Sequence, residues 1–566
     1  MKNTVLESGH RKSSNFYRSD LILEHYLHTQ LSARSLAYMN ERLDRLGAQA
    51  ACEMDELSMT ADKQGPVLHK RNFFGETVNE IRFHPAYWQL AKIAVESEMF
   101  RVKWEPELRS RFQEERHRLG FAAGLLFAMG ESGLYCPLCM TDGVAVLIDR
   151  YCTEEDKGRL LPHIYTDNAE ELYTGAMFLT EKAGGSDVGA NLVTATTTDG
   201  DYWHLNGEKW FCSNANANII FALARTRPEI QGTRGLGIFL VEPTLPDGSP
   251  NSFDIVRLKD KLGTRSMASG EFLLQDTKAT LVGGETEGFK IMTDMINLSR
   301  LYNSVAALAG MRRSLIEAYQ FLKFRATFGK PALSHPLIRT KLLELGALHL
   351  SHFYLTWRAI EALDKSENGN ESEAALIRLL TPMTKKATAE IGVYIVRESM
   401  ELMGGMGYIE DGIMPKLMRD VLVLPIWEGA GNIMVLDMLR AVLKSEGLGV
   451  MLKEIDAAFK TSVEIEAGDE RWQFAITELR ALEGLLHQLP TQAEEVVQAT
   501  AKPAFERLTQ LYQLACLLKY RDEASAAWID LACSFLLEKL THSRQGFVKV
   551  PSLDEVEVIL GWDLGA

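Results

Sequence analysis

The period of the hydrophobic pattern changes twice along the chain, and this constrains the fold more than any other feature. Apolar residues recur every three or four positions up to about residue 172, follow a two-residue period from about 173, and return to the first spacing after 284. The first spacing is typical of half-buried helices and the second of half-buried strands. Because the strands form one block and do not alternate with helices, we predict an α+β fold with segregated classes.

Four successive domains follow from this pattern. We expect a helical domain over 1–172, a central antiparallel β-domain over 173–284, a helical bundle over 285–445 and a helical extension over 446–566. Helices are expected over 21–48, 85–131 and 371–402, and a strand over 236–241. Pro490, Pro503 and Pro551 are expected to break helices of the extension. Within the β-domain, Asn206-Gly207 suits a two-residue turn, so 202–211 is predicted to be a β-hairpin.

Composition narrows the class of protein. The 566 residues carry a net charge of −15, which disfavours electrostatic binding of the whole molecule to nucleic acid. Seven cysteines at irregular spacings argue against a disulfide scaffold. No apolar run reaches the length of a membrane helix and no secretory signal begins the chain, so a cytoplasmic location is expected.

Three segments carry candidate chemistry. Residues 180–187 (TEKAGGSD) follow a predicted strand, and the paired glycines would let a ligand approach the backbone; a plain turn is the alternative. Residues 210–214 (WFCSN) offer an aromatic ring for stacking and a hydroxyl donor, or else an aromatic that packs on a sheet. In 426–432 (IWEGAGN), burial against Trp427 would raise the pKa of Glu428 and suit it as a general base; a helix N-terminal carboxylate is the alternative.

Several other motifs have simpler interpretations. A lone CxxC, Cys136 to Cys139, has no second ligand pair for zinc, so these cysteines are expected in the core or a pocket wall, and no metal site is predicted. His349 and His352 are expected to be packed or solvated side chains. The pairs 312–313 (Arg-Arg) and 385–386 (Lys-Lys) are interpreted as solvated helix faces.

Taken together, five ordered blocks resemble the acyl-CoA dehydrogenase family. They lie at 177–188, 207–214, 261–265, 325–329 and 402–432. The extended N-terminus, the forms of 260–265 and 427–432, and the added tail are most similar to the alkylation-response AidB branch. The resemblance implies an N-terminal helical domain, a β-domain and a helical bundle, with FAD bound between them in a homotetramer (or homodimer).

The resemblance also implies a reaction and residues for it. Family members are oxidoreductases that act on the CH–CH bond of an acyl-CoA: a carboxylate removes the α-proton and the β-hydride goes to flavin N5, the electrons then passing to an acceptor that the sequence does not identify. Glu428 matches this carboxylate, and its backbone N–H, with a flavin hydroxyl, would polarise the thioester carbonyl. Where some members carry the base before an arginine, this chain has Ser299 before Arg300.

Further positions match the family's cofactor and substrate contacts. The matched substrate positions are Ser186, Arg300 and Gly429, and the matched FAD positions are Met177, Thr180, Gly185, Ser186, Phe211, Ser213, Arg325, Phe328, Gly404, Gly405 and Asn432. Arg325 and Phe328 match residues that reach the adenosine half of FAD on a neighbouring subunit. Asn432 replaces a common glutamine, and Glu401 and Ala430 also depart from the usual residues.

A second function stays open at this point. An AidB-like flavoprotein associated with DNA and alkylation defence, with little dehydrogenase activity, would need a basic surface in the extension. Residues 446–566 contain 20 acidic and 11 basic residues, a net charge of −9. We therefore rank FAD-dependent acyl-CoA dehydrogenase first, consider a nucleic-acid partner unlikely on charge, and expect the extension to complete the oligomer.

Overall fold

The chain divides into two compact units, each assembled from separate stretches. The computed structural model describes residues 15–197, 202–465, 469–541 and 550–563. A helical unit combines the described residues of Met1–Cys52, Gln113–Met129 and Asn303–Ala566, and a sheet unit combines Glu53–Phe112 and Gly130–Tyr302. The predicted α+β class is confirmed, whereas the division into four successive domains stays a prediction.

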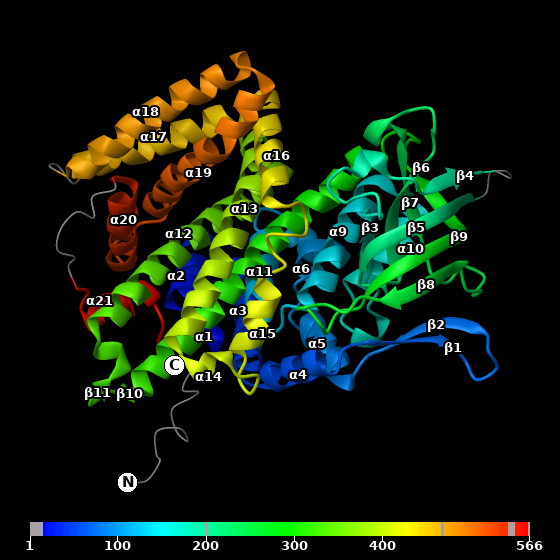
Figure 1. Cartoon of the computed structure of the whole chain (residues 1–566), viewed down its shortest axis with the longest axis horizontal. Coiled ribbons are helices and arrows are strands. Elements are labelled where there is room, and N and C mark those ends of the chain that lie inside the picture. Colours follow the sequence, from blue (N-terminus) through cyan, green and yellow to red (C-terminus); the bar gives the residue numbers. More distant parts are fainter. Residues whose placement is uncertain (1–14, 198–201, 466–468, 542–549, 564–566) are drawn as a thin grey trace, which may run out of the picture. The chain divides into compact units, whose positions relative to one another are not determined.

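The helical unit consists of long helices that pack side by side. The bundle helices α12 and α13 lie against each other, and α12 also packs against α19, α20 and α21 of the extension (Figure 1). Its helices are α1 (Phe16–Ser19), α2 (Leu21–Gln30), α3 (Ala33–Ala51), α12 (Pro336–Glu367), α13 (Glu371–Leu402), α14 (Gly405–Tyr408), α15 (Met414–Val421), α16 (Gly431–Lys444), α17 (Gly447–Ile465), α18 (Glu470–Gln488), α19 (Glu494–Lys519), α20 (Ala526–Thr541) and α21 (Leu553–Leu560). The short strands β10 (Ala326–Thr327) and β11 (Lys330–Pro331) form a tight hairpin.

Two helices cross the boundary between the units, α8 (Arg116–Gly130) and α11 (Gly288–Phe324). The remaining helices belong to the sheet unit: α4 (Glu53–Lys63), α5 (Pro85–Glu96), α6 (Arg101–Trp104), α7 (Pro106–Arg111), α9 (Tyr135–Tyr151) and α10 (Glu154–Ile164). No described helix is both long and apolar enough to cross a membrane.

The main sheet has seven strands whose pairings close into a ring. They are β3 (Gly175–Phe178), β4 (Thr194–Thr196), β5 (Trp203–Ser213), β6 (Ile219–Arg225), β7 (Leu236–Val241), β8 (Phe253–Leu258) and β9 (Ser269–Val282). The ring runs β6–β4–β5–β9–β7 and back to β6, with β3 joined to β6 and β8 to β9. Pairing is antiparallel, as predicted for this domain, except that β6 runs parallel to β3 and β4.

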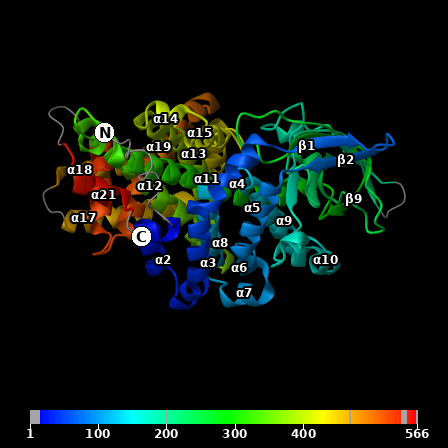
Figure 2. The same cartoon turned by 90° about the horizontal axis from the view of Figure 1, so that it is seen from below.

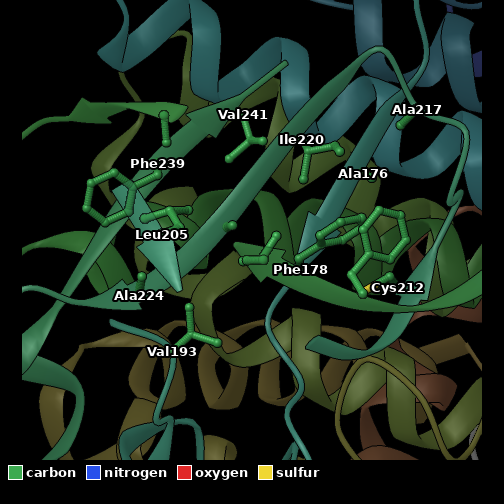
Figure 3. Close-up of a cluster of buried hydrophobic side chains, with 14 of the residues drawn as sticks. Ala176, Phe178, Val193, Leu205, Cys212, Ala217, Ile220, Ala224, Phe239 and Val241 are labelled. Carbon is green, nitrogen blue, oxygen red and sulfur yellow. The ribbon is translucent and has the colours of Figure 1, made fainter. Parts of the chain in front are cut away.

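Alternate residues of these strands point into a common apolar core. Phe178, Leu205, Ile220 and Phe239 are buried there with smaller side chains, including Val193 and Cys212 (Figure 3). A separate hairpin, β1 (Val67–Arg71) with β2 (Thr77–Arg82), lies beside this sheet within the same unit (Figure 2). Lys70 Nζ bonds Asp254 of β8 at 2.8 Å, and this ion pair holds the hairpin to the sheet edge.

The hairpin predicted at 202–211 is wrong. Residues Trp203–Ser213 form one continuous strand, β5, that pairs along β9. The register shifts between Leu205 and Gly207, and Gly207 adopts φ +135°, so the glycine forms a β-bulge and not a turn. Asn206 bonds Asp276 on β9 through both its side-chain oxygen and nitrogen, at 2.9 Å each, which stabilises the bulge.

Pro503 also differs from its prediction, because it lies inside α19 and does not end it. The predicted helices over 21–48 and 85–131 are each divided into shorter helices, and the hairpin β1–β2 was not predicted at all. The helix expected over 371–402 has those bounds in the structure.

Candidate functional site

The loop that follows β3 is anchored by a buried ion pair. Glu181 accepts a hydrogen bond from Lys209 Nζ at 2.7 Å, and both side chains are buried. The same carboxylate accepts hydrogen bonds from the backbone N–H groups of Leu192 and Val193. Burial lowers the pKa of Lys209, and the charge of Glu181 opposes that shift. This ion pair therefore anchors the glycine loop to β5, and the sequence pattern did not predict it.

Thr180 and Gly185 of this loop lie against each other. A Cβ atom on Gly185 would come within 3.0 Å of Thr180 Oγ1, so only glycine leaves the hydroxyl uncrowded. The Thr180 carbonyl accepts a hydrogen bond from the Trp210 N–H at 2.9 Å, which joins the loop to β5. Ser186 is exposed nearby in sequence, and Met177 is half-buried on β3.

Phe211 presents an aromatic ring at the surface of the sheet unit. It is 57% exposed, although its neighbours Lys209 and Cys212 on β5 are fully buried. Lys259 Nζ lies 4.7 Å from the Phe211 ring centre and 3.3 Å from that of Trp210, which fixes both rings by cation–π contact. Ser213 is half-buried and ends β5. A stacking ring and a hydroxyl therefore lie two residues apart on one strand, on the same side of the pleat.

Ser299 and Arg300 lie in α11, within the part that belongs to the sheet unit. Both are buried, and Ser299 Oγ donates to the Ile296 carbonyl at 2.8 Å. The Arg300 guanidinium donates to Asn297 Oδ1 at 3.2 Å. A serine hydroxyl bonded within its own helix cannot act as a carboxylate base, so this position holds none.

In the helical unit, Glu428 lies in a strained loop before α16. Its φ is +55° and that of Gly429 is +97°, so two consecutive residues are left-handed. A residue with a Cβ atom disfavours this region by roughly 1–2 kcal/mol, and such outliers cluster at functional sites. Glu428 is half-buried, so its carboxylate is neither in the core nor fully solvated.

Two bonds from buried partners hold that loop. Lys385 on α13 donates from Nζ to the Gly429 carbonyl at 2.7 Å, and Trp427 donates from its indole N–H to Asn303 Oδ1. Lys385 is 1% exposed and Asn303 is 4% exposed. The left-handed conformation of Glu428 is therefore imposed by the surrounding helices.

This finding corrects the interpretation of the paired basic residues. Lys385 and Lys386 are both buried, and Lys386 bridges Glu390 and Glu506 at 2.7 and 3.0 Å. Arg312 and Arg313 are also buried; Arg312 bonds both carboxylate oxygens of Asp20, at 2.7 and 2.8 Å. Sequence periodicity does not distinguish a solvated cation from a buried one whose partner is distant in the chain.

The other predicted contacts in the helical unit are exposed. Phe328 is 96% exposed, with φ +50°, in the two-residue turn of the β10–β11 hairpin, and Arg325 precedes β10. Gly404, with φ +59°, and Gly405 lie at the start of α14. Asn432 is exposed in the first turn of α16.

Of the cysteines, Cys136 and Cys139 are buried in α9, in agreement with a core or pocket-wall position. His349 and His352 are buried side chains of α12.

The side chains in the sheet unit fit a planar heteroaromatic cofactor. The Phe211 ring is available for stacking, Ser213 and Thr180 supply hydroxyls, and the missing Cβ of Gly185 leaves space beside Thr180. In the helical unit, Glu428 supplies a proton acceptor on a rigid loop.

Three family models match successive parts of the chain. Residues 7–168 match the adaptive response protein AidB N-terminal domain, 176–277 the acyl-CoA dehydrogenase middle domain, and 286–443 the acyl-CoA dehydrogenase C-terminal domain. The chain is 32% identical to the putative acyl-CoA dehydrogenase AidB of Escherichia coli over 92% of both proteins.

Two solved structures show the same architecture. Caenorhabditis elegans ACDH-11, in complex with C11-CoA, has a TM-score of 0.86 and 26% identity, with 96% of this chain and 94% of that chain covered. A Bacillus anthracis acyl-CoA dehydrogenase complexed with FAD has a TM-score of 0.69 and 18% identity, covering 94% and 88%, and its likeness concerns the fold alone.

Proposed function

The chain belongs to the acyl-CoA dehydrogenase family, with an AidB-type N-terminal domain, and on that premise we propose that it is an FAD-dependent acyl-CoA dehydrogenase. The reaction removes a proton from the α carbon and a hydride from the β carbon of an acyl-CoA thioester, leaving a carbon–carbon double bond. FAD, when bound, supplies the acceptor of the hydride.

The conformation of Glu428 is the observation that carries this proposal. A glutamate is a poor choice for a left-handed position, where glycine, asparagine or aspartate is normally found. Here Lys385 bonds the Gly429 carbonyl and Trp427 bonds Asn303, so the residues on both sides of Glu428 are held in place and the unfavourable φ is maintained. We assign it the role of the base that accepts the α-proton.

The backbone of the same loop has a second role. The N–H group of the base residue, together with a hydroxyl of the cofactor, would polarise the thioester carbonyl and so acidify the α-proton. Gly429 has no side chain to obstruct a thioester beside that N–H, and Lys385 restrains its carbonyl. Ser299 offers no competing base, which leaves the assignment to Glu428.

Each unit contains proposed cofactor contacts. In the sheet unit these are Met177, Thr180, Gly185, Ser186, Phe211 and Ser213; in the helical unit they are Arg325, Phe328, Gly404, Gly405 and Asn432. Arg300, Ser186 and Gly429 are proposed substrate contacts. The exposed Phe328 ring supports a homotetramer or homodimer in which one subunit completes the adenosine site of another.

The C11-CoA complex of the worm relative supports an acyl-CoA as the substrate class. The test is a spectrum of the purified protein followed by titration with acyl-CoAs of 4, 8, 11 and 16 carbons in the presence of an electron acceptor. We expect a flavin spectrum that bleaches with at least one chain length. A flavin that no acyl-CoA bleaches would contradict the dehydrogenase activity without affecting the cofactor assignment.

Glu428→Gln tests the base directly. We expect the variant to keep FAD. The rate at which acyl-CoA bleaches the flavin should fall by about 10²- to 10⁴-fold, because general base catalysis contributes a factor of that size. Glu229→Gln, the same change at an exposed loop position, should keep the full rate. Equal rates for Glu428→Gln and the parent protein would contradict its assignment as the base.

A further inference from the structure

A cavity of about 280 Å³, partly open to solvent, lies in the helical unit where the extension meets the bundle. Its walls come from α12, α13 and α16 of the bundle and from α19 and α20 of the extension (Figure 1). The family model of the C-terminal domain ends at residue 443, so two of the five helices are outside it. None of the residues assigned above to FAD or to the thioester lines this cavity.

Most of the wall is apolar. Five of the lining side chains are large, apolar and at most 4% exposed: Leu348, Met383, Met438, Phe505 and Leu540. A surface of this kind stabilises an aliphatic chain by burial, at about 25 cal/mol for each Å² removed from water. The volume corresponds to about nine non-hydrogen atoms at the roughly 30 Å³ that a water molecule occupies in the liquid.

One polar group on the wall has no hydrogen-bond partner among the described residues. Gln513 on α19 is 3% exposed, and no described residue accepts a hydrogen bond from its Nε2. A buried donor without an acceptor costs about 1–3 kcal/mol, and most buried side-chain amides are satisfied. Because Gln513 lines the cavity, an acceptor on a bound ligand would satisfy this amide.

His352 on α12 supplies the complementary group. Its Nδ1 lies 2.7 Å from the Leu348 carbonyl and must donate to it, so the proton of the neutral ring is on Nδ1. Burial, with the charge of Lys539, lowers the pKa of His352 to about 4, which keeps the ring neutral at pH 7. Nε2 is then an acceptor, and His352 lines the cavity.

The charges around the cavity balance. Lys386 bonds Glu390 and Glu506 at 2.7 and 3.0 Å, so its charge is already matched by carboxylates on both sides. Thr509 donates to the Phe505 carbonyl at 2.7 Å and offers no further proton. Lys539 is a second cation of the lining, so two lysines and two glutamates face the cavity and their charges sum to zero. An anionic head group would add an unmatched negative charge and would meet the Nε2 lone pair of His352, whereas a neutral head group meets one donor and one acceptor.

We propose that this cavity is a binding site for a neutral aliphatic molecule of about nine non-hydrogen atoms, with one terminal hydroxyl or primary amide. The head group accepts a hydrogen bond from Gln513 Nε2 and donates one to His352 Nε2, while the chain lies against the leucine, methionine and phenylalanine side chains. The ligand thereby joins α12 of the bundle to α19 of the extension. This site is separate from the proposed catalytic residues and does not depend on the dehydrogenase assignment.

Isothermal titration calorimetry of the full chain with 1-octanol, octanamide and octanoate at pH 7.5 tests the site. We expect saturable binding of one 1-octanol or octanamide per chain, and at least tenfold weaker binding of octanoate. If octanoate bound as tightly as 1-octanol, the proposal that the ligand has a neutral head group would be wrong. Absence of saturable binding by 1-octanol and octanamide would overturn the site.

Two substitutions and a matched control locate the binding. Gln513→Leu and His352→Phe each remove one hydrogen-bonding group at similar volume, and each should raise the Kd of 1-octanol about tenfold, the equivalent of 1.4 kcal/mol. Gln498→Leu makes the same change on the exposed face of α19 and should leave the Kd unchanged. Gln513→Leu with the parent Kd would overturn the proposal; if His352→Phe does not fold, Gln513→Leu alone decides, because it removes an unsatisfied group.

Discussion

At the scale of single residues, two positions of the proposed function have an unfavourable backbone conformation. Glu428 and Phe328 both have positive φ, +55° and +50°, although neither residue type favours it. One is held by neighbouring helices, and the other occupies the first position of a two-residue turn, with Gly329 at φ +80°. In such a turn asparagine is preferred, and an almost fully exposed phenylalanine contributes nothing to the core.

Phe328→Asn should therefore separate stability from cofactor binding. The substitution suits the turn, so we expect the melting temperature of the apoprotein to stay level or rise. Loss of the aromatic contact should raise the Kd of FAD about tenfold, measured by fluorescence titration. Phe73→Asn, at another almost fully exposed phenylalanine, should change neither value. Unchanged FAD affinity in Phe328→Asn would remove this ring from the cofactor site.

At the scale of elements, one glutamate joins the bundle to the extension. Glu361 on α12 accepts hydrogen bonds from Lys365 and from Tyr520, the residue that follows α19, and lies 3.7 Å from Lys519. Burial alone would raise the pKa of Glu361, but the charges of Arg358 and Lys519 and these hydrogen bonds outweigh it and lower the pKa to about 2. The carboxylate is therefore more acidic in the folded state than in the unfolded chain.

The pH dependence of stability follows from that shift. A lowered carboxyl pKa stabilises the fold above the unfolded value of about 4.3, and the contribution is lost as the pH falls toward 2. The full difference corresponds to about 3 kcal/mol at pH 7. Glu361→Gln should lower the urea midpoint at pH 7 and flatten its decline between pH 5 and 2. Glu495→Gln, an exposed change on α19, should do neither; a Glu361→Gln midpoint that declines as steeply as that of the parent would contradict the coupling.

Periodicity predicted the elements more fully than their connections. Helix α13 and strand β7 have the predicted bounds because each carries a long, uninterrupted apolar pattern. Asn206-Gly207 was misinterpreted because a glycine with positive φ serves a bulge as well as a turn, and only the pairing partner, β9, distinguishes them. The hairpin β1–β2 was missed because its strands are mostly exposed and show little alternation.

The same limit applies to the site. Local motifs made Glu428, Thr180 and Phe211 candidates with alternatives, and the family resemblance implied their roles; the strain at Glu428 and the exposure of Phe211 support these proposals. Lys385 and Glu181 were not found as supporting residues, because their partners Gly429 and Lys209 lie 44 and 28 positions away. No local spacing predicts that pairing.

At the scale of the whole molecule, the distribution of charge favours an enzyme over a nucleic-acid-binding protein. The chain has a net charge of −15, and the extension contributes −9 from 20 acidic and 11 basic residues. Each arginine that the structure describes in the extension already pairs with a carboxylate: Arg471 with Asp469, Arg480 with Asp456, Arg507 with Glu478 and Arg521 with Asp530. Phosphate contacts would have to replace these ion pairs, at a cost that free cations do not carry.

We therefore expect no retardation of duplex DNA by the full chain at about 150 mM salt, because binding that depends on phosphate contacts weakens steeply at that ionic strength. An electrophoretic mobility assay at low and physiological salt measures this directly. The triple variant Glu494→Lys, Glu495→Lys, Glu523→Lys places three cations on exposed positions of the extension and should retard DNA at low salt, which shows that the assay detects a change of charge. Salt-sensitive retardation by the parent chain at 150 mM would instead favour a DNA-associated role. If, in addition, no acyl-CoA bleached the flavin, both results would support an AidB-like protein with little dehydrogenase activity.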